Sequence, residues 1–103
     1  MIIAIVQFPM PAGLAPDVVR ERFAESVPRF QGLPGLLRKN YLYDPKAGTG
    51  GGAYLWESRA VAEAYYNEAW RERMGKMLGS VPSVTYFDSP VQVDNTVPAP
   101  RPA

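Results

Sequence analysis

The stretch 33–57 constrains the fold more than any other part of this 103-residue chain. Residues 36–43 and 51–57 are rich in Leu, Tyr and Trp, which is typical of β-strands, and the segment 44–50 between them is rich in Asp, Pro and Gly. The pattern therefore predicts a hairpin with its loop at 44–50. Lys39 lies among the apolar residues of the first strand. Such a lysine is either a solvated edge residue or the chemical centre of an apolar pocket.

A strand and a helix are predicted before the hairpin. Residues 2–8 alternate with apolar side chains on both faces, which predicts a strand that is covered on both sides. Residues 15–30 predict a helix, and Pro28 is expected to kink or end it. Glu25 and Arg29 are spaced to pair on its outer side. The charged residues Arg20, Glu21 and Arg22 are expected to face solvent, and the apolar stripe of Val19, Phe23, Val27 and Phe30 is expected to face the core.

A second helix and a last strand are predicted after the hairpin. Ser58 is expected to cap the helix and Gly79 to end it. The last strand is expected at 81–87, and the Pro-rich segment 95–103 is expected to be an extended tail. The buried stripe of the helix is expected to comprise Ala62, Tyr65, Tyr66 and Ala69, and to continue after a drift or a break with Trp70, Met74, Met77 and Leu78.

The order of these elements predicts the architecture. Strand, helix, strand, strand, helix, strand is the βαββαβ order of the α+β ferredoxin-like fold, in which both helices cover one face of a four-stranded antiparallel sheet. Residues 1–94 would form this one domain. The other face of the sheet would also be apolar, and an exposed apolar face marks an interface. We therefore expect a homodimer in which two sheet faces meet, the alternative being a monomer with a partly apolar free face.

Composition excludes several classes of function. The net charge is +1 and no run of basic residues occurs, so no nucleic-acid or membrane partner is expected. The chain has no cysteine and no histidine, which excludes disulfides and thiolate chemistry and removes the commonest general base, metal ligand and haem ligand. We expect no metal site and no cofactor. The apolar start of the chain is too short for a signal or membrane segment, so a cytoplasmic protein is expected.

Three segments, 33–39, 51–56 and 62–66, together carry a resemblance to a known family. The positions that match its pattern are Pro34, Gly35, Lys39, Gly51, Gly52 and Tyr54. The chain resembles the YdhR-like family, whose members are named as monooxygenases and belong, with the antibiotic-biosynthesis monooxygenases, to the dimeric α/β-barrel superfamily. The resemblance extends from the first strand to about Asp94. It departs at Arg38, where the family is associated with a tryptophan.

The resemblance implies a dimeric α/β barrel and a monooxygenase that needs no cofactor. Such enzymes oxidise small hydrophobic aromatic compounds of the phenol, anthrone or quinol type with dioxygen, and the substrate itself supplies the electrons. The superfamily also contains isomerases, haem-degrading enzymes and proteins without a known activity, so the fold does not settle the function. The lack of histidine argues against the haem-degrading branch. Two alternatives stay open: a non-catalytic dimeric module that binds a hydrophobic ligand, and an isomerase or cyclase on the same barrel.

The candidate site is built around Lys39. If strand alternation places Leu37, Lys39 and Tyr41 on the core face, the lysine lies in an apolar pocket, where its pKa falls and it can accept a proton. Tyr41 or Tyr54 is its expected hydrogen-bonding neighbour, so Lys39, Tyr41 and Tyr54 form the predicted catalytic group. Aromatic side chains can stack on a flat substrate, and a cation can stabilise its anion. The predicted substrate-binding residues are Phe30, Arg38, Trp56, Tyr65, Tyr66, Trp70 and Met74.

A simpler interpretation stands beside this one. Tyrosines and tryptophans on sheets and helices usually pack in the core, methionines such as Met74 fill gaps there, and lone lysines lie mostly on the surface. The position of Lys39 separates the two interpretations. A cavity reached by Lys39 and at least two aromatic side chains favours an enzyme or a ligand-binding protein, whereas a filled core with Lys39 in water favours neither.

Overall fold

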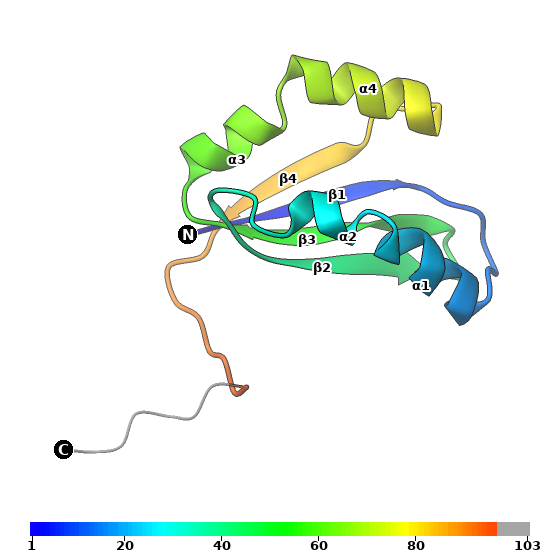
Figure 1. Cartoon of the computed structure of the whole chain (residues 1–103), viewed down its shortest axis with the longest axis horizontal. Helices are drawn as coiled ribbons and strands as arrows, with labels where there is room; N and C mark the ends of the chain where they lie inside the picture. Colours follow the sequence, from blue (N-terminus) through cyan, green and yellow to red (C-terminus); the bar gives the residue numbers. More distant parts are fainter. Residues whose placement is uncertain (97–103) are drawn as a thin grey trace.

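The computed structural model describes residues 1–96 of the chain. Its strands are β1 (Ile2–Pro9), β2 (Leu36–Asp44), β3 (Thr49–Trp56) and β4 (Ser83–Asp88), which form one sheet in the order β2-β3-β1-β4 (Figure 1). Every neighbouring pair is antiparallel. The hairpin loop is shorter than predicted, because Asp44 belongs to β2 and Thr49 and Gly50 belong to β3. The predicted tail lies, from residue 97 onwards, outside the described residues.

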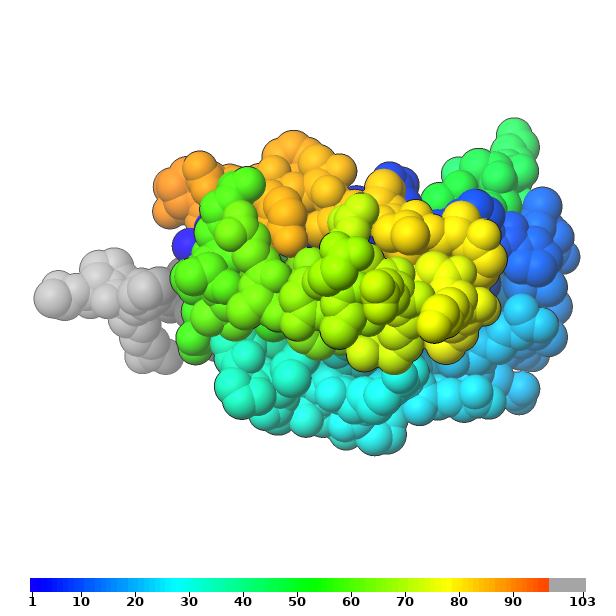
Figure 2. All heavy atoms as spheres, turned by 90° about the horizontal axis from the view of Figure 1, so that it is seen from above, coloured from blue at the N-terminus to red at the C-terminus, as the bar shows by residue number. Residues whose placement is uncertain are grey.

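Within residues 1–96, the helices lie on one side of the sheet. The first pair, α1 (Pro16–Ala24) and α2 (Val27–Phe30), lies beside β2 and β3, and the second pair, α3 (Arg59–Tyr65) and α4 (Glu68–Leu78), lies on the side of β4 (Figure 1). The space-filling view shows α3 and α4, in green to yellow, running along the cyan surface of α2 (Figure 2). The predicted α+β ferredoxin-like fold is confirmed, with each predicted helix divided in two. None of these helices has the length and apolar character that a membrane crossing requires.

The first predicted helix ends earlier than expected. The backbone N–H and the hydroxyl of Ser26 both donate to the carbonyl of Phe23, at 3.1 and 3.0 Å, and this arrangement closes α1. Pro28 then lies in the first turn of α2, where its missing N–H costs nothing. The kink predicted at Pro28 therefore occurs at Glu25 and Ser26 instead. The predicted pairing of Glu25 with Arg29 is wrong, because the break separates them and no ion pair joins them in the described part of the chain.

The second predicted helix is interrupted just before Asn67. The side-chain oxygen of Asn67 accepts a hydrogen bond from the backbone N–H of Trp70 at 2.9 Å, so Asn67 caps α4 in the way that Ser58 caps α3. Gly79 ends α4 in the left-handed conformation, with a φ of 82°, as predicted. Ala69 and Met77 were expected in the buried stripe, but both are exposed, Met77 to 60%, because the break changes the face of α4 that meets the core.

A β-bulge in β2 decides which of its side chains face the helices. The pairing with β3 shifts between Leu36 and Arg38, so Leu37 is an extra residue, and its side chain is exposed. Lys39 pairs with Tyr54 and, together with Tyr41, faces the helices. The prediction that Leu37 shares this face is therefore wrong, while Lys39 and Tyr41 do share it.

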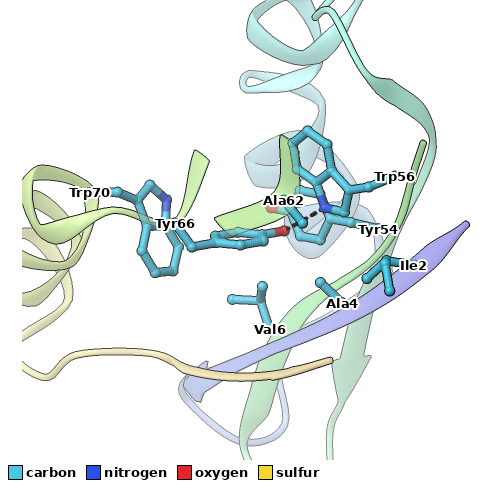
Figure 3. Close-up of a cluster of buried hydrophobic side chains, with 8 residues drawn as sticks. All are labelled: Ile2, Ala4, Val6, Tyr54, Trp56, Ala62, Tyr66 and Trp70. Atoms are coloured by element: carbon cyan, nitrogen blue, oxygen red, sulfur yellow. Dashed lines mark hydrogen bonds between the residues drawn. The ribbon is translucent and has the colours of Figure 1, made fainter. Parts of the chain in front are cut away.

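The core lies between the inner face of the sheet and the helices (Figure 3). The indole N–H of Trp56 donates to the hydroxyl of Tyr66 at 3.2 Å, so this buried donor has a partner inside the core. Most of the core comes from alternate residues of β1 and β3 and from one face of α3 and α4. Its buried members are Ile2, Ala4, Val6, Tyr54, Trp56, Ala62, Tyr66 and Trp70.

The outer face of the sheet carries no helix from the described residues (Figure 1). Alternation along β1 places Ile3 and Ile5 on this face, and Phe87 of β4 pairs with Ile3 there. Phe87 is 54% exposed. Arg38 lies on the same face and makes a 2.8 Å ion pair with Asp94, which follows β4. An apolar outer face is thus present, as the sequence predicts, but its edge is charged.

Candidate active site

A cavity of about 350 Å³ lies between the sheet and the two pairs of helices. Residues of β1, β2 and β3 line it from below, and residues of α1, α2 and α4, with Tyr65 at the end of α3, line it from above. Its lining is mostly apolar and aromatic. A larger depression of about 610 Å³ lies beside α1, with Gly13, Pro16 and Pro45 in its lining. That depression is shallower and contains one charged side chain, that of Arg20, so it offers less chemistry.

Lys39 reaches into the cavity and ends among three aromatic rings. Its ammonium nitrogen lies 3.5 Å from the ring centre of Phe30, 4.0 Å from that of Tyr41 and 4.5 Å from that of Tyr54. A cation over aromatic faces is attracted by their negative π-surface. Within residues 1–96 the ammonium makes no ion pair. Rings therefore surround this charge, and a carboxylate does not neutralise it.

Gly52 makes room for the lysine side chain. A Cβ atom at Gly52 would lie 3.1 Å from Cε of Lys39 and 2.9 Å from Cε1 of Tyr54. Such distances are shorter than ordinary contacts in a close-packed interior. A larger residue at Gly52 would therefore displace either the lysine or the tyrosine ring.

Burial and, to a smaller extent, the nearby charge of Arg29 together lower the pKa of Lys39 from 10.5 to about 7. Removing the ammonium from water disfavours its charged form, and a second cation adds repulsion. Near neutral pH, the lysine therefore exists in both forms. Its neutral amine can accept a proton, and its ammonium can stabilise an anion.

Two tyrosines of the cavity, Tyr54 and Tyr65, remain protonated at neutral pH. Burial raises the pKa of Tyr54, with smaller contributions from Tyr65 and Tyr41, and burial also raises the pKa of Tyr65. The hydroxyls of Tyr41 and Ser26 lie 2.6 Å apart and share a hydrogen bond. The predicted hydrogen bond between Lys39 and Tyr41 or Tyr54 does not form, because both tyrosines present their ring faces to the ammonium. Tyr41 and Tyr54 therefore enclose the ammonium of Lys39 without accepting a hydrogen bond from it.

Most of the predicted site residues meet in this cavity. The three predicted catalytic residues lie on β2 and β3, and the predicted binding residues come from three different helices. The residues brought together are Lys39, Tyr41, Tyr54, Phe30, Tyr65, Trp70 and Met74.

Three predicted binding residues, Arg38, Trp56 and Tyr66, lie outside the cavity lining. Arg38 is on the outer face of the sheet, paired with Asp94, because the bulge and the strand alternation turn it away from Lys39. Trp56 is 1% exposed and packs in the core, where Tyr66 accepts its N–H hydrogen bond. The structure does not bring any of these three side chains to the cavity surface.

Three arginines that the sequence did not single out also line the cavity. Arg22 on α1, Arg29 on α2 and Arg73 on α4 come from separate helices, and all three are exposed. Arg22 was expected on a solvated face, and it borders the cavity while remaining in contact with solvent. The sequence carries one signal for Arg22 and Arg29, because each directly precedes a phenylalanine of the predicted buried stripe, Phe23 or Phe30.

Comparison with known proteins bears on the family. The family model described as "Putative mono-oxygenase ydhR" matches residues 3–93, which is most of the chain. No curated protein sequence matches the chain.

Solved structures share the fold. A mutant of MhuD with two manganese protoporphyrin IX molecules bound per active site has a TM-score of 0.66 and 21% identity, over 92% of this chain and 100% of that chain. An antibiotic biosynthesis monooxygenase from Deinococcus radiodurans, titled as putative, has a TM-score of 0.64 and 11% identity, over 91% and 97% of the two chains. A monooxygenase from the ActVA-Orf6 gene of Streptomyces coelicolor, in complex with nanaomycin D, has a TM-score of 0.61 and 18% identity, over 95% and 92%.

At these identities the structural likeness establishes the fold, and the family model establishes membership. Within residues 1–96, the matched span 3–93 includes all strands and helices except the first residue of β1, and the whole cavity lining. The features on which the resemblance rested, including Lys39 and the glycines of β3, lie inside it. The chain belongs to the ydhR mono-oxygenase family.

Proposed function

We propose that this protein is a monooxygenase that oxidises a small hydrophobic aromatic substrate of the phenol, anthrone or quinol type with dioxygen and needs no cofactor. The observation that carries the proposal is the Lys39 ammonium, held among three aromatic rings that line the cavity. Because no carboxylate of the described residues neutralises it, an anionic substrate can supply the missing charge.

The first step would be proton removal by Lys39. A flat ring can lie against the side chains of Tyr65 and Trp70, which line the same cavity. The neutral amine of Lys39 then takes a proton from the phenolic O–H, or from the methylene carbon of an anthrone, and becomes an ammonium. That ammonium stabilises the substrate anion as it forms. A pKa near 7 suits this exchange, since a base works best close to the operating pH.

The second step would join the anion to dioxygen. The anion gives one electron to dioxygen, and the two radicals combine to form a carbon–oxygen bond and a peroxide anion. The Lys39 ammonium returns its proton to the peroxide. For an anthrone methylene, the hydroperoxide loses water and leaves a carbonyl group, so one oxygen atom enters the product and the other leaves as water. The substrate supplies all of the electrons.

The size of the cavity supports a small ligand. A volume of about 350 Å³ is at the lower end of the range for small-molecule sites, and its lining is largely apolar with few polar groups. Two structural neighbours hold ligands, a manganese protoporphyrin in MhuD and nanaomycin D in the Streptomyces coelicolor protein, which supports a role in binding small organic molecules. The chain has neither histidine nor cysteine, the commonest axial ligands of haem iron, so we favour the organic substrate.

We also propose that two copies of the chain associate through the outer faces of their sheets. Ile3, Ile5 and Phe87 lie on that face, and no helix of the described residues covers it. A two-fold contact buries the same patch on both copies. The cavity lies on the opposite side of the sheet, so each copy would hold its own site.

Oxygen consumption tests the proposed activity. Purified protein freed of metal is mixed with a panel of anthrones, phenols and quinols, and dissolved oxygen is followed with an electrode. We expect consumption with at least one anthrone or quinol, and one atom of ¹⁸O from labelled dioxygen in the product. Binding of these compounds without oxygen consumption would contradict the enzyme and support the non-catalytic binding module. Turnover without any uptake of oxygen would support the isomerase or cyclase.

A further inference from the structure

The cavity collects cations from separate elements and no acid. Its charged lining residues are Arg22 from α1, Arg29 from α2, Lys39 from β2 and Arg73 from α4, and its lining contains no aspartate or glutamate. The chain as a whole has 11 basic and 10 acidic residues, so composition does not explain this separation of charge. The positive potential is a property of the cavity.

The positions of the cations differ. Lys39 is partly buried among three rings, whereas Arg22, Arg29 and Arg73 are exposed, and we call these three arginines the rim of the cavity. The charges of two of them reach the interior: Arg29 lowers the pKa of Lys39, and both Arg29 and Arg73 act on Tyr65 to oppose the rise of its pKa. The cavity thus has an aromatic interior with one cation and a rim with three.

The arginines of the rim are not occupied by carboxylates of the described residues. The ion pairs of residues 1–96 join Arg20 to Asp17, Arg38 to Asp94 and Arg59 to Glu63. None of these six residues lines the cavity. A guanidinium binds a carboxylate with two parallel hydrogen bonds, which is stronger than a neutral contact. Three such groups line one cavity, and none of them has a carboxylate partner among the described residues.

We infer that the ligand of this cavity is an amphipathic aromatic acid, whose flat ring lies in the aromatic interior and whose permanent anionic group, such as a carboxylate, lies against Arg22, Arg29 and Arg73. The assignment of the ring as the reacting end rests on the proposed function. The assignment of the anionic end rests on the charges alone. Two anions at opposite ends of one ligand, the reacting oxygen or carbon at Lys39 and the carboxylate at the rim, would match the two groups of cations. Neutral polycyclic compounds would fill the interior and leave the rim unused.

A matched pair of probes tests the inference without requiring turnover. Naphthalene-2-carboxylate and naphthalene-2-carboxamide share one ring system and differ in charge. Trp70 lines the cavity, so quenching of tryptophan fluorescence reports binding of either compound. We expect the carboxylate to bind about tenfold more tightly than the amide, because hydrogen bonds to a charged group exceed neutral ones by about that factor. Added salt should lower the affinity for the carboxylate and leave the affinity for the amide unchanged.

Arginine variants assign the preference to the rim. Arg29→Gln and Arg73→Gln should each lower affinity for the carboxylate severalfold and leave affinity for the amide unchanged. Arg71→Gln, on the same helix as Arg73, and Arg20→Gln, on α1, lie outside the cavity lining, and as controls they should change neither affinity. All four side chains are exposed, so the variants should fold.

Three results would overturn the inference. The first is equal affinity for the two probes. The second is a preference for the carboxylate that survives both Arg29→Gln and Arg73→Gln. The third is a preference that disappears in Lys39→Met but not in the arginine variants, which would place the anionic group at the lysine. A preference for the carboxylate in a protein that consumes no oxygen would instead support the inference and contradict the proposed oxidation.

Discussion

Lys39 shows how one residue can be suited to chemistry by what surrounds it. Three ring faces attract its ammonium, while burial and the charge of Arg29 lower its pKa to about 7. The lysine therefore exists in both its neutral and its charged form near neutral pH, and no carboxylate of the described residues fixes its protonation state. An anionic ligand would shift the balance toward the ammonium.

Lys39→Met should separate folding from function. The substitution keeps most of the side-chain volume and removes the charge, so the fold should be retained and the urea midpoint should be equal or higher near neutral pH. Oxidation of phenols or anthrones should fall by at least about a hundredfold if Lys39 is the base. Lys46→Met, in the hairpin turn, is the control and should change neither property. Undiminished turnover in Lys39→Met would show that the base lies elsewhere.

Stability should depend on pH through the same lysine. Its pKa is about 7 in the folded chain and 10.5 in the unfolded chain, so between these values the unfolded chain binds more protons. The free energy of unfolding should therefore rise as pH increases from about 7 to about 9. The tyrosines with raised pKa oppose this effect only above about pH 10. Urea titrations of the parent protein and Lys39→Met should show the rise in the first and a flatter profile in the second.

The hydrogen bond inside the core makes a separate prediction. Tyr66→Phe removes the acceptor of the Trp56 indole N–H and leaves that buried group unpaired. We expect a loss of about 1–2 kcal/mol in the free energy of unfolding. Tyr65→Phe removes a hydroxyl for which the described residues provide no hydrogen bond, and it should cost less. Equal effects of the two substitutions in urea titrations would contradict this account.

At the scale of elements, the pairing of β3 with β1 depends on Gly51, which has no side chain. A Cβ atom at Gly51 would collide with the carbonyl oxygen of Val6 on β1, and neither backbone can move away without breaking the pairing. Gly51→Ala should therefore cost more than about 2 kcal/mol of stability. Gly32→Ala is the control, because its space is open and its φ of 72° should cost about 1 kcal/mol. Thermal melts that rank the two variants in the opposite order would contradict the prediction.

The sequence predicts the elements well because their signals are local. Alternating residues mark β1 and β2, and Ser58 and Gly79 mark the ends of the second helical region. The helix breaks were predicted less well, since Ser26 closes α1 through bonds to its own neighbour Phe23, and a serine inside a helical pattern carries no such signal.

The site was only partly predictable, for a related reason. The bulge at Leu37 depends on pairing with β3, which no local pattern reveals. The pattern nevertheless placed Lys39 and Tyr41 together, because residues on the far side of the bulge keep their alternation. The rim arginines come from three helices, so their meeting depends on tertiary structure.

For the whole molecule, the structure shows which residues of the outer sheet face would form the proposed dimer interface. The structure identifies Ile3 and Ile5, rather than Ala4 and Val6, as the outward-facing residues of β1. Ile5→Asp should give a monomer in light scattering at micromolar concentration, because burying an unpaired charge in an apolar interface costs several kcal/mol. Val18→Asp, on the exposed side of α1, is the control and should remain dimeric. A monomeric parent protein would contradict the proposed association.

Gly52 links the shape of the site to the substitutions that the family can accept at this position. The space for the lysine exists because this one position lacks a methyl group, so a single base change that introduces alanine would alter the reach of Lys39. Relatives with alanine or serine at the equivalent position would thus be natural experiments in ligand size. We expect such proteins to accept narrower rings, or to carry their base on a different strand.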